Sequence, residues 1–262
     1  MDDIARRLAE RWRILADHNA VWTRPLLDLT PEAAKQRVDA FDWLGDVRGR
    51  DVLLIAGGGG QQSAAYGLLG ARVTVFDLTS AQLEHDRRAA EHYGYQVETV
   101  QGDMRDLSAL EGRTFDVVHQ PYSINFVPSP LPVFEGVRRV LRPGGHYRLR
   151  LVNPFVAGMT HRDWQQVGYV LTRRYEEGAE VSYPDQEWVF KGEGQAPPPR
   201  EFRHTLGTII RGLASNGFVV DDLREDTGLD PEGEPGSWGH FQTVAAPWWT
   251  LHARVAGAGD KS

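Results

Sequence analysis

The sequence predicts a doubly wound α/β fold, in which helices cover both faces of a mostly parallel β-sheet. Strand-like and helix-like runs alternate between residues 51 and 151, and four glycines in a row (residues 57–60) end the first of these strands. A tight turn at residues 141–145 leads into a further strand. The chain has 262 residues, 41% of them hydrophobic, which is enough to bury one large core. We therefore expect a single domain over residues 1–262.

The elements are expected in strict alternation. Short apolar runs predict strands at residues 52–55, 72–76, 96–100, 115–119 and 146–151. Among the helices between them, one begins at Thr79, which has the spacing of a capping box with Gln82, and ends at Gly94. Around this core of residues 51–151 we expect a helical N-terminal lid (1–48), an aromatic cap inserted after the fifth strand (152–202), and a C-terminal helix with strands (203–256).

The composition narrows the class of partner. The formal net charge is -7, which argues against nucleic acid because phosphate binding needs basic patches. No apolar run approaches the ~20 residues of a membrane span, and the charged first residues lack the apolar stretch of a secretory signal. Cysteine is absent, and no histidine spacing suggests a metal site. We expect a cytoplasmic protein that acts on a small molecule without a metal; the oligomeric state stays open.

The four glycines mark the expected binding site. Backbone without a Cβ atom turns sharply and lets a ligand approach closely, and a helix N-terminus beside it favours electron-rich groups. A P-loop is excluded, because no Gly-Lys-Ser/Thr follows. A dinucleotide fingerprint fits poorly, since its sixth position falls on Gln62 or Ser63 instead of glycine.

Two acidic residues follow the next two strands. Asp77 ends the second strand, where a carboxylate can accept hydrogen bonds from both hydroxyls of a ribose. Asp103 follows the third strand, where it can accept the exocyclic amine of an adenine while Met104 packs on the ring. The carboxyl ends of parallel strands share one edge of a sheet, so the glycines and both acids are expected to form one site.

This order of motifs over residues 51–151 resembles the class I S-adenosylmethionine-dependent methyltransferases. The resemblance implies a Rossmann-like sheet of seven mostly parallel strands with the last strand antiparallel, and S-adenosyl-L-methionine as cofactor. It implies cofactor contacts at Ala56, Gly57, Gly58, Gly59, Gly60, Gln61, Asp77, Leu78, Gln82, Gly102, Asp103, Met104, His119 and Gln120. The sequence departs from the family at Leu54, where an acid is common, and at Ala56, where glycine is usual. Gln61 and Gln62 are candidates to hold the amino group of the methionine part.

Methyl transfer is a direct displacement, which needs a base only where the nucleophile carries a proton. His119 and Tyr122, after the fourth strand, are the expected catalytic residues. The run Gln-Pro-Tyr at residues 120–122 resembles in part the Asx-Pro-Pro-aromatic loop of amino-methylating enzymes, which slightly favours an amine. The acceptor side is expected to include Tyr122, Asn125, Arg150, Asn153 and His204. Whether oxygen, nitrogen or sulfur is methylated stays open.

The fifth strand carries two arginines that need partners. A period of two places Arg148 and Arg150 on one face, although a central parallel strand should be apolar on both. A structural ion pair with a neighbouring helix is favoured, with contact between Arg150 and an acidic substrate group as the alternative.

Two other functions also stay open. In a nicotinamide-dependent oxidoreductase, Asp77 would hold the adenosine ribose, but the missing sixth glycine speaks against this. A non-catalytic protein that binds S-adenosylmethionine or S-adenosylhomocysteine would fit the unusual Leu54 and the lack of an evident base.

Overall fold

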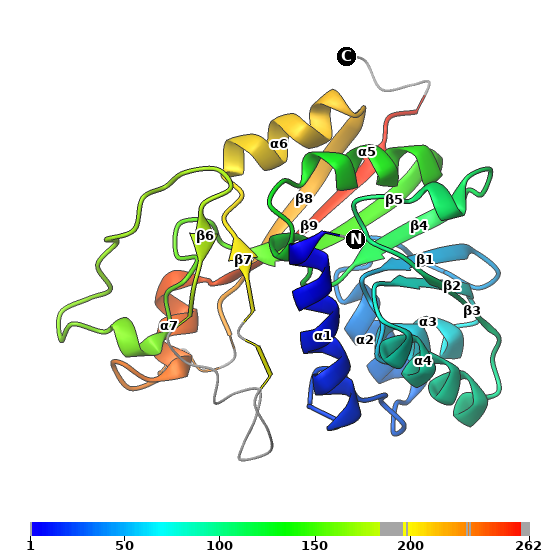
Figure 1. Ribbon diagram of the computed structural model, residues 1–262, viewed down its shortest axis with the longest axis horizontal. Helices are drawn as coiled ribbons and strands as arrows, with labels where there is room; N and C mark the ends of the chain where they lie inside the picture. Colours follow the sequence, from blue (N-terminus) through cyan, green and yellow to red (C-terminus); the bar gives the residue numbers. More distant parts are fainter. Residues whose placement is uncertain (1, 184–195, 198, 229, 231, 258–262) are drawn as a thin grey trace.

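The sheet has seven strands in the order β3-β2-β1-β4-β5-β9-β8 within the part of the chain that the structure describes (Figure 1). The computed structural model describes residues 2–183, 196–197, 199–228, 230 and 232–257. The strands from β3 to β5 run parallel, and β9 runs antiparallel to both of its neighbours. This confirms the predicted doubly wound sheet with an antiparallel last strand. The strands are β1 (Asp51–Ile55), β2 (Arg72–Asp77), β3 (Val97–Gln101), β4 (Phe115–Gln120), β5 (Leu141–Val152), β8 (Phe218–Asp226) and β9 (Trp248–Val255).

Helices cover both faces of this sheet (Figure 1). The helices are α1 (Asp3–Asp17), α2 (Pro31–Asp39), α3 (Gln62–Leu68), α4 (Ser80–Tyr93), α5 (Leu131–Val140), α6 (Leu206–Ser215) and α7 (Trp238–Ala245). One core lies under α5 and α6, and a second core lies under α2, α3 and α4. Consecutive side chains of β1 enter opposite cores: Leu53 and Ile55 the first, Val52 and Leu54 the second. Burial on both faces explains why β1 is a continuous apolar run.

The start of α4 differs from the predicted capping box. Thr79 precedes the helix but makes no side-chain cap, because its hydroxyl donates to Oδ1 of Asp77 over 3.2 Å. Gln82 instead lines the main cavity, and its buried Oε1 has no hydrogen-bond partner among the described residues. The predicted helix end is confirmed, since Gly94 adopts the left-handed conformation with φ of 71°.

The segment after β5 forms a cap beside the carboxyl edge of the sheet. It contains a short helix, η3 (His161–Asp163), and a hairpin of β6 (Glu180–Val181) and β7 (Glu201–Phe202). The C-terminal helix α7 completes it, because the ring of Tyr169 lies 5.0 Å from that of Phe241. Residues 184–195 and 198 of the expected cap, which include Trp188 and Phe190, lie outside the described residues.

The N-terminal region divides between two places. α2 packs into the second core beside α3, whereas α1 stands between the sheet and the β6–β7 hairpin (Figure 1). No helix in the described ranges combines the length and apolar character that crossing a membrane requires.

Candidate functional site

A cavity of about 950 Å³ lies at the carboxyl ends of β1, β2, β4 and β5. Small-molecule sites span ~300–1,000 Å³, so this volume leaves room for a cofactor and a second molecule. The strand ends line one half, and α1, the cap and α7 line the other. The expected site residues that line it are Ala56, Gly57, Gly58, Gln61, Gln62, Asp77, Leu78, Gln82, Gly102, Asp103, Met104, His119, Tyr122 and Arg150.

The glycine loop packs directly against Asp77. A Cβ atom on Gly58 would lie 2.9 Å from Oδ2 of Asp77 and 2.7 Å from Cβ of Gln82, which no side chain tolerates. The amides of Gly58 and Thr79 each donate to the Asp77 carboxylate over 3.0 Å. These bonds fix the carboxylate at the cavity wall, where burial raises its pKa. The Thr79 hydroxyl also donates to Oδ1, so three of the about four lone-pair sites of the carboxylate are used. One site stays open to a ribose hydroxyl, and a second opens where a ligand displaces the rotatable Thr79 hydroxyl.

The second half of the loop is held by Asp86 of α4, which the sequence prediction missed. Its carboxylate accepts the amides of Gly59 and Gly60 over 3.1 and 3.0 Å and the Ser63 hydroxyl over 2.5 Å. Gly59 and Gly60 therefore face Asp86 and do not line the cavity. Burial raises the pKa of Asp86 to about 7. One feature of the sequence could have indicated Asp86: it lies three residues after Leu83 and so falls on the apolar face of α4, where an acid needs a partner.

An ion-pair bridge ties α1 to the loop after β3. Arg105 lies 2.6 Å from a carboxylate oxygen of Asp103 and 2.7 Å from one of Asp2, the N-cap of α1. The bridge holds α1 across the cavity while leaving Asp103 and Met104 in its lining. Any adenine amine that binds Asp103 must therefore share the carboxylate with Arg105.

One end of the cavity is basic. Arg37 of α2 donates to Oε1 of Gln61 over 2.8 Å, and Gln61 in turn donates to the backbone carbonyls of Val21 and Arg24. The buried Nε atoms of Arg37 and Arg148 have no hydrogen-bond partner among the described residues. Two incompletely satisfied guanidinium groups beside the glycine loop suit an anionic group such as a carboxylate.

His119 is buried within this basic end. Arg148 donates to its Nε2 over 2.5 Å, and its Nδ1 lies 3.1 Å from the Tyr66 hydroxyl. A guanidinium has no acceptor, so the neutral ring carries its proton on Nδ1 and donates to Tyr66. Burial, and then the charge of Arg148, hold the pKa of His119 well below its usual range. Both ring nitrogens are thus occupied, which favours a role in positioning Arg148.

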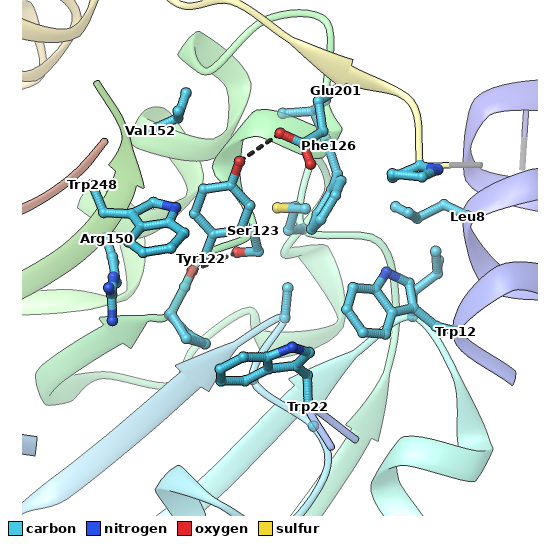
Figure 2. Close-up of a pocket in the computed structure, with 18 of the residues that line it drawn as sticks. Leu8, Trp12, Trp22, Tyr122, Ser123, Phe126, Arg150, Val152, Glu201 and Trp248 are labelled. Atoms are coloured by element: carbon cyan, nitrogen blue, oxygen red, sulfur yellow. Dashed lines mark hydrogen bonds between the residues drawn. The ribbon is translucent and has the colours of Figure 1, made fainter. Parts of the chain in front are cut away.

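The other half of the cavity is aromatic (Figure 2). Trp12 and Trp22 face it from the N-terminal region, and Trp248 faces it from the start of β9. Arg150 pairs with Asp226 over 2.7 Å. Its partner belongs to β8, so the ion pair joins two strands, and the expected helix partner was wrong.

Tyr122 stands in the middle of this aromatic half (Figure 2). It donates to Oε2 of Glu201 over 2.5 Å, and both residues line the cavity. Burial raises the pKa of Glu201 to about 7 and raises that of Tyr122 well above its usual range. Sequence analysis missed Glu201, because it lies 79 positions after Tyr122 in a two-residue strand with no motif around it.

Two expected acceptor-side residues brace the backbone outside the cavity lining. Asn125 donates to the Phe202 carbonyl over 3.0 Å and accepts the Val152 amide over 3.1 Å, which joins β7 to the end of β5. Asn153 donates to the Ala245 carbonyl over 2.9 Å at the end of α7.

His204 and Gln120 also lie outside the lining. His204 is buried, with Nδ1 3.1 Å from Glu177 and Nε2 3.1 Å from the Ile124 carbonyl. Gln120 accepts the Tyr147 hydroxyl over 2.5 Å and donates to the sulfur of Met104 over 3.3 Å, beneath the site. Their side chains hold the walls of the cavity in place. No group of three or more potential metal ligands occurs among the described residues.

Comparison with known proteins places the chain in a family. A family model described as a methyltransferase domain matches residues 53–149. The uncharacterized methyltransferase YbaJ of Bacillus subtilis is 35% identical over 191 residues, which cover 71% of this chain and 72% of that protein. A ubiquinone biosynthesis O-methyltransferase of Pseudomonas syringae is 32% identical over 151 residues, and the match covers 56% of this chain and 60% of that enzyme.

A solved structure agrees with the fold. The S-adenosylmethionine-dependent methyltransferase from Mesorhizobium loti superposes with a TM-score of 0.65 at 21% identity, covering 87% of this chain and all of the other. The sequence match spans most of the chain, and the sheet carries the glycine loop and Asp77 at neighbouring strand ends. The chain therefore belongs to the class I S-adenosylmethionine-dependent methyltransferases.

Proposed function

We propose that this S-adenosylmethionine-dependent enzyme methylates a small molecule bound in the aromatic half of the cavity. The observation that carries the proposal is the cavity itself, which runs from the glycine loop to Tyr122 and Trp248 without a dividing wall. Two ligands in one cavity can meet in the fixed geometry that a displacement needs, and such positioning is worth ~7–11 kcal/mol of the barrier. Because the chain belongs to this family, we set aside the nicotinamide-dependent oxidoreductase and the non-catalytic binding protein as alternative functions.

We propose the following cofactor contacts. Asp77 accepts the ribose hydroxyls, and Asp103 accepts the adenine amine beside Leu78 and Met104, which line the same wall. The methionine part lies over Gly57 and Gly58. Its carboxylate meets the basic end at Arg37, whose buried Nε lacks a partner among the described residues. The cofactor, when bound, supplies the activated methyl group on its sulfonium sulfur.

The nucleophile is proposed to be oxygen. The Gln-Pro-Tyr run at residues 120–122 no longer favours an amine, because Gln120 accepts a hydrogen bond from Tyr147 and does not line the cavity. The likeness to O-methyltransferases of ubiquinone biosynthesis points toward a hydroxyl acceptor. The net charge of -7 and the absence of cysteine support a cytoplasmic enzyme that does not act on nucleic acid.

The test is to trace a labelled methyl group. Purified protein and [methyl-¹³C]S-adenosylmethionine are incubated with a cell extract separated into small metabolites and macromolecules. Label is expected among the small metabolites and is expected to be lost with Asp77→Ala. Label in protein or nucleic acid would overturn the small-molecule proposal. Calorimetric titration with S-adenosylhomocysteine, run beside NADH as a negative control, establishes that the preparation binds cofactor.

A further inference from the structure

Glu201 is a buried acid in the wall of the cavity, with an unusual set of partners. It is 5% exposed and lies in β7, opposite the strand ends. Tyr122 donates to it over 2.5 Å, and Tyr183 also donates a hydrogen bond to it. Arg11 of α1 also acts on it by charge. Burial outweighs the two phenols and this charge, so the charged form of the carboxylate is poorly stabilised.

Glu177, a second glutamate of the cap, provides a comparison, because its hydrogen bonds are those of a carboxylate with a structural role. Glu177 accepts hydrogen bonds from the ring of His204 and from the amide and hydroxyl of Thr205. These partners hold the pKa of Glu177 near 2, although burial alone would raise it. Burial is the dominant influence on Glu201, and the pKa of Glu201 rises to about 7. Glu177 is thus permanently charged, whereas Glu201 can take up and release a proton near neutral pH.

We propose that Glu201 is the proton acceptor for a neutral, hydroxyl-bearing methyl acceptor with an apolar body, and that Tyr122 links the two. This inference rests on the proposed function and names the substrate class of the same site. The acceptor oxygen attacks the methyl carbon, the carbon–sulfur bond breaks, and its electron pair stays on sulfur. The hydroxyl proton moves to the Tyr122 oxygen as the Tyr122 proton moves to Glu201, or moves to Glu201 directly.

Tyr122 alone cannot serve as the base. Burial and the charge of Glu201 raise its pKa well above the usual value, so its anion is not populated at neutral pH. The Tyr122 oxygen has two lone pairs, and its hydrogen bond with Tyr183 uses at most one of them, so it can accept a hydrogen bond from a substrate hydroxyl while it donates to Glu201. The base function therefore belongs to Glu201, and the phenol extends its reach into the cavity.

The charges around the cavity select against other nucleophiles. Five arginines and four acids line the cavity, and two of the arginines, Arg105 and Arg150, are paired with two of the acids. The lining is therefore positive by about one charge, and a sulfonium cofactor adds a further positive charge. A cationic ammonium acceptor would enter against this field. A thiol ionises with a pKa of ~8.5 and needs little help from a base. A neutral hydroxyl, in contrast, does need a proton acceptor in the site. The apolar body of such a molecule fits among Trp12, Trp22 and Trp248.

The experiment compares three variants on the labelled products of the extract and on three matched probes. The probes are naphthalen-2-ol, naphthalen-2-amine and naphthalene-2-thiol, which differ only in the nucleophile. Glu201→Gln removes the proton acceptor at constant volume, and Tyr122→Phe removes the link. Glu180→Gln makes the same chemical change in the neighbouring strand β6, where Glu180 is an exposed partner of Arg200 and does not line the cavity.

We expect the label in methyl ethers, identified by the chemical shift of the methyl carbon. Glu201→Gln should lower kcat for hydroxyl acceptors by about 10²–10⁴-fold. The wild-type rate should rise with pH through about 7 and then level, and Glu201→Gln should lose this rise. Tyr122→Phe should move the rise to higher pH, because the Tyr122 hydrogen bond lowers the pKa of Glu201. Glu180→Gln should match the wild type throughout.

The failures are distinguishable. If S-adenosylhomocysteine does not bind, or the label enters macromolecules, the proposed function fails before Glu201 is tested. If cofactor binds normally and the label appears on nitrogen or sulfur, or if no hydroxyl compound is methylated, the hydroxyl class is overturned. If ethers form and Glu201→Gln keeps both its rate and its pH profile, Glu201 is not the proton acceptor. Thermal melting and S-adenosylhomocysteine titration show that each variant is folded.

Discussion

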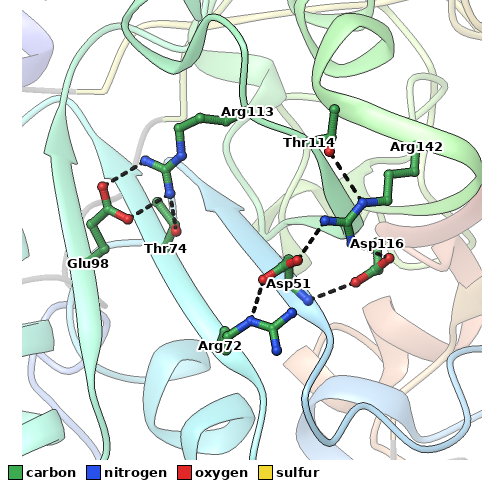
Figure 3. A network of polar contacts seen from close by, with 8 residues as sticks. All are labelled: Asp51, Arg72, Thr74, Glu98, Arg113, Thr114, Asp116 and Arg142. Atoms are coloured by element: carbon green, nitrogen blue, oxygen red, sulfur yellow. Dashed lines mark hydrogen bonds and ion pairs between the residues drawn. The ribbon is translucent and has the colours of Figure 1, made fainter.

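The two edges of the sheet differ in how their charged side chains are paired and how deeply they are buried. At the amino edge, Asp51 lies 2.6 Å from Arg72 and 2.7 Å from Arg142, and Arg142 also pairs with Asp116 over 2.5 Å (Figure 3). These side chains are partly exposed, and each charge meets an opposite charge. At the carboxyl edge, Arg105 and Arg150 are also paired with acids, but Asp77, Asp86 and Glu201 are buried. The buried Nε atoms of Arg37 and Arg148 have no partner among the described residues.

The pKa values record this contrast. Hydrogen bonds from Arg72 and Arg142 lower the pKa of Asp51 to about 2, whereas burial raises those of Asp86 and Glu201 to about 7. A network that satisfies its own charges has little to offer a ligand. A cavity wall that holds desolvated, incompletely bonded charges is costly in free energy, and a bound ligand that supplies the missing hydrogen bonds reduces this cost. We therefore expect the charges of the amino edge to contribute to stability and those of the carboxyl edge to contribute to ligand binding.

The largest expected effect is the loss of cofactor affinity in Asp77→Ala. Two ribose hydroxyls that donate to a carboxylate contribute ~1.5–3 kcal/mol each, so affinity should fall at least a hundredfold. Calorimetric titration with S-adenosylhomocysteine measures it. Asp116→Ala, on the amino edge, is the matched control and should bind as the wild type does. Equal affinity in both variants would remove Asp77 from the site.

The next effect is a pH dependence carried by Asp86. Its folded pKa of about 7 lies above the unfolded value of ~3.9, so the folded state binds more protons between these pH values. The contribution of Asp86 to the free energy of unfolding should therefore fall as pH rises from 4 to 7, by at most ~1.4 kcal/mol per pH unit. Asp86→Asn cannot ionise and should lose that part of the slope in urea unfolding.

Glu201 contributes a slope of the same sign, so Glu201→Gln and the double variant complete the measurement. The double variant should lose both contributions, and the pH dependence that remains should come from other groups such as Asp77, whose pKa burial raises, and His119, whose pKa burial lowers. The groups that face Asp86 are the amides of Gly59 and Gly60, the Ser63 hydroxyl and, by charge, Asp77 and Tyr95. An unchanged slope in Asp86→Asn would mean that its carboxyl is solvated in the folded protein.

A smaller effect of opposite sign is expected at the amino edge. Asp51 has a folded pKa near 2, so its contribution is present above pH ~4 and is lost as pH falls toward 2. Asp51→Asn should cost ~1 kcal/mol at pH 7, because partly exposed ion pairs are worth little individually. High salt should weaken the wild type toward the variant by screening the pairs. A cost that salt leaves unchanged would point to the hydrogen bonds of Asp51 instead.

The sequence predicted the parts of this molecule that depend on local pattern. Strands buried on both faces give apolar runs, and Gly94 ends a helix for a reason visible within four residues. The common position of Asp77 and Asp103 in the cavity lining was predictable, because the strand ends of a parallel sheet meet at one edge. Glu201 could not be found in this way, because its contact with Tyr122 depends on how a cap of some 50 residues folds back. Asp86 was missed because a single acid on an apolar helix face resembles a solvated residue until its partners are known.

The smallest effect concerns Ala56, which stands where the family usually has glycine. Its φ is 47°, in the left-handed region that costs a residue with a Cβ atom ~1–2 kcal/mol. Ala56→Gly removes this strain but adds ~0.5–1 kcal/mol of unfolded-state entropy. Urea unfolding should therefore show a net gain of ~0.5 kcal/mol. Ala64→Gly, in the buried middle of α3, is the control and should lose at least ~1 kcal/mol. A loss of that size at Ala56 as well would mean that the turn into the glycine loop is not strained in solution, and that the cavity wall at Ala56 is held by the methyl group instead of by the backbone.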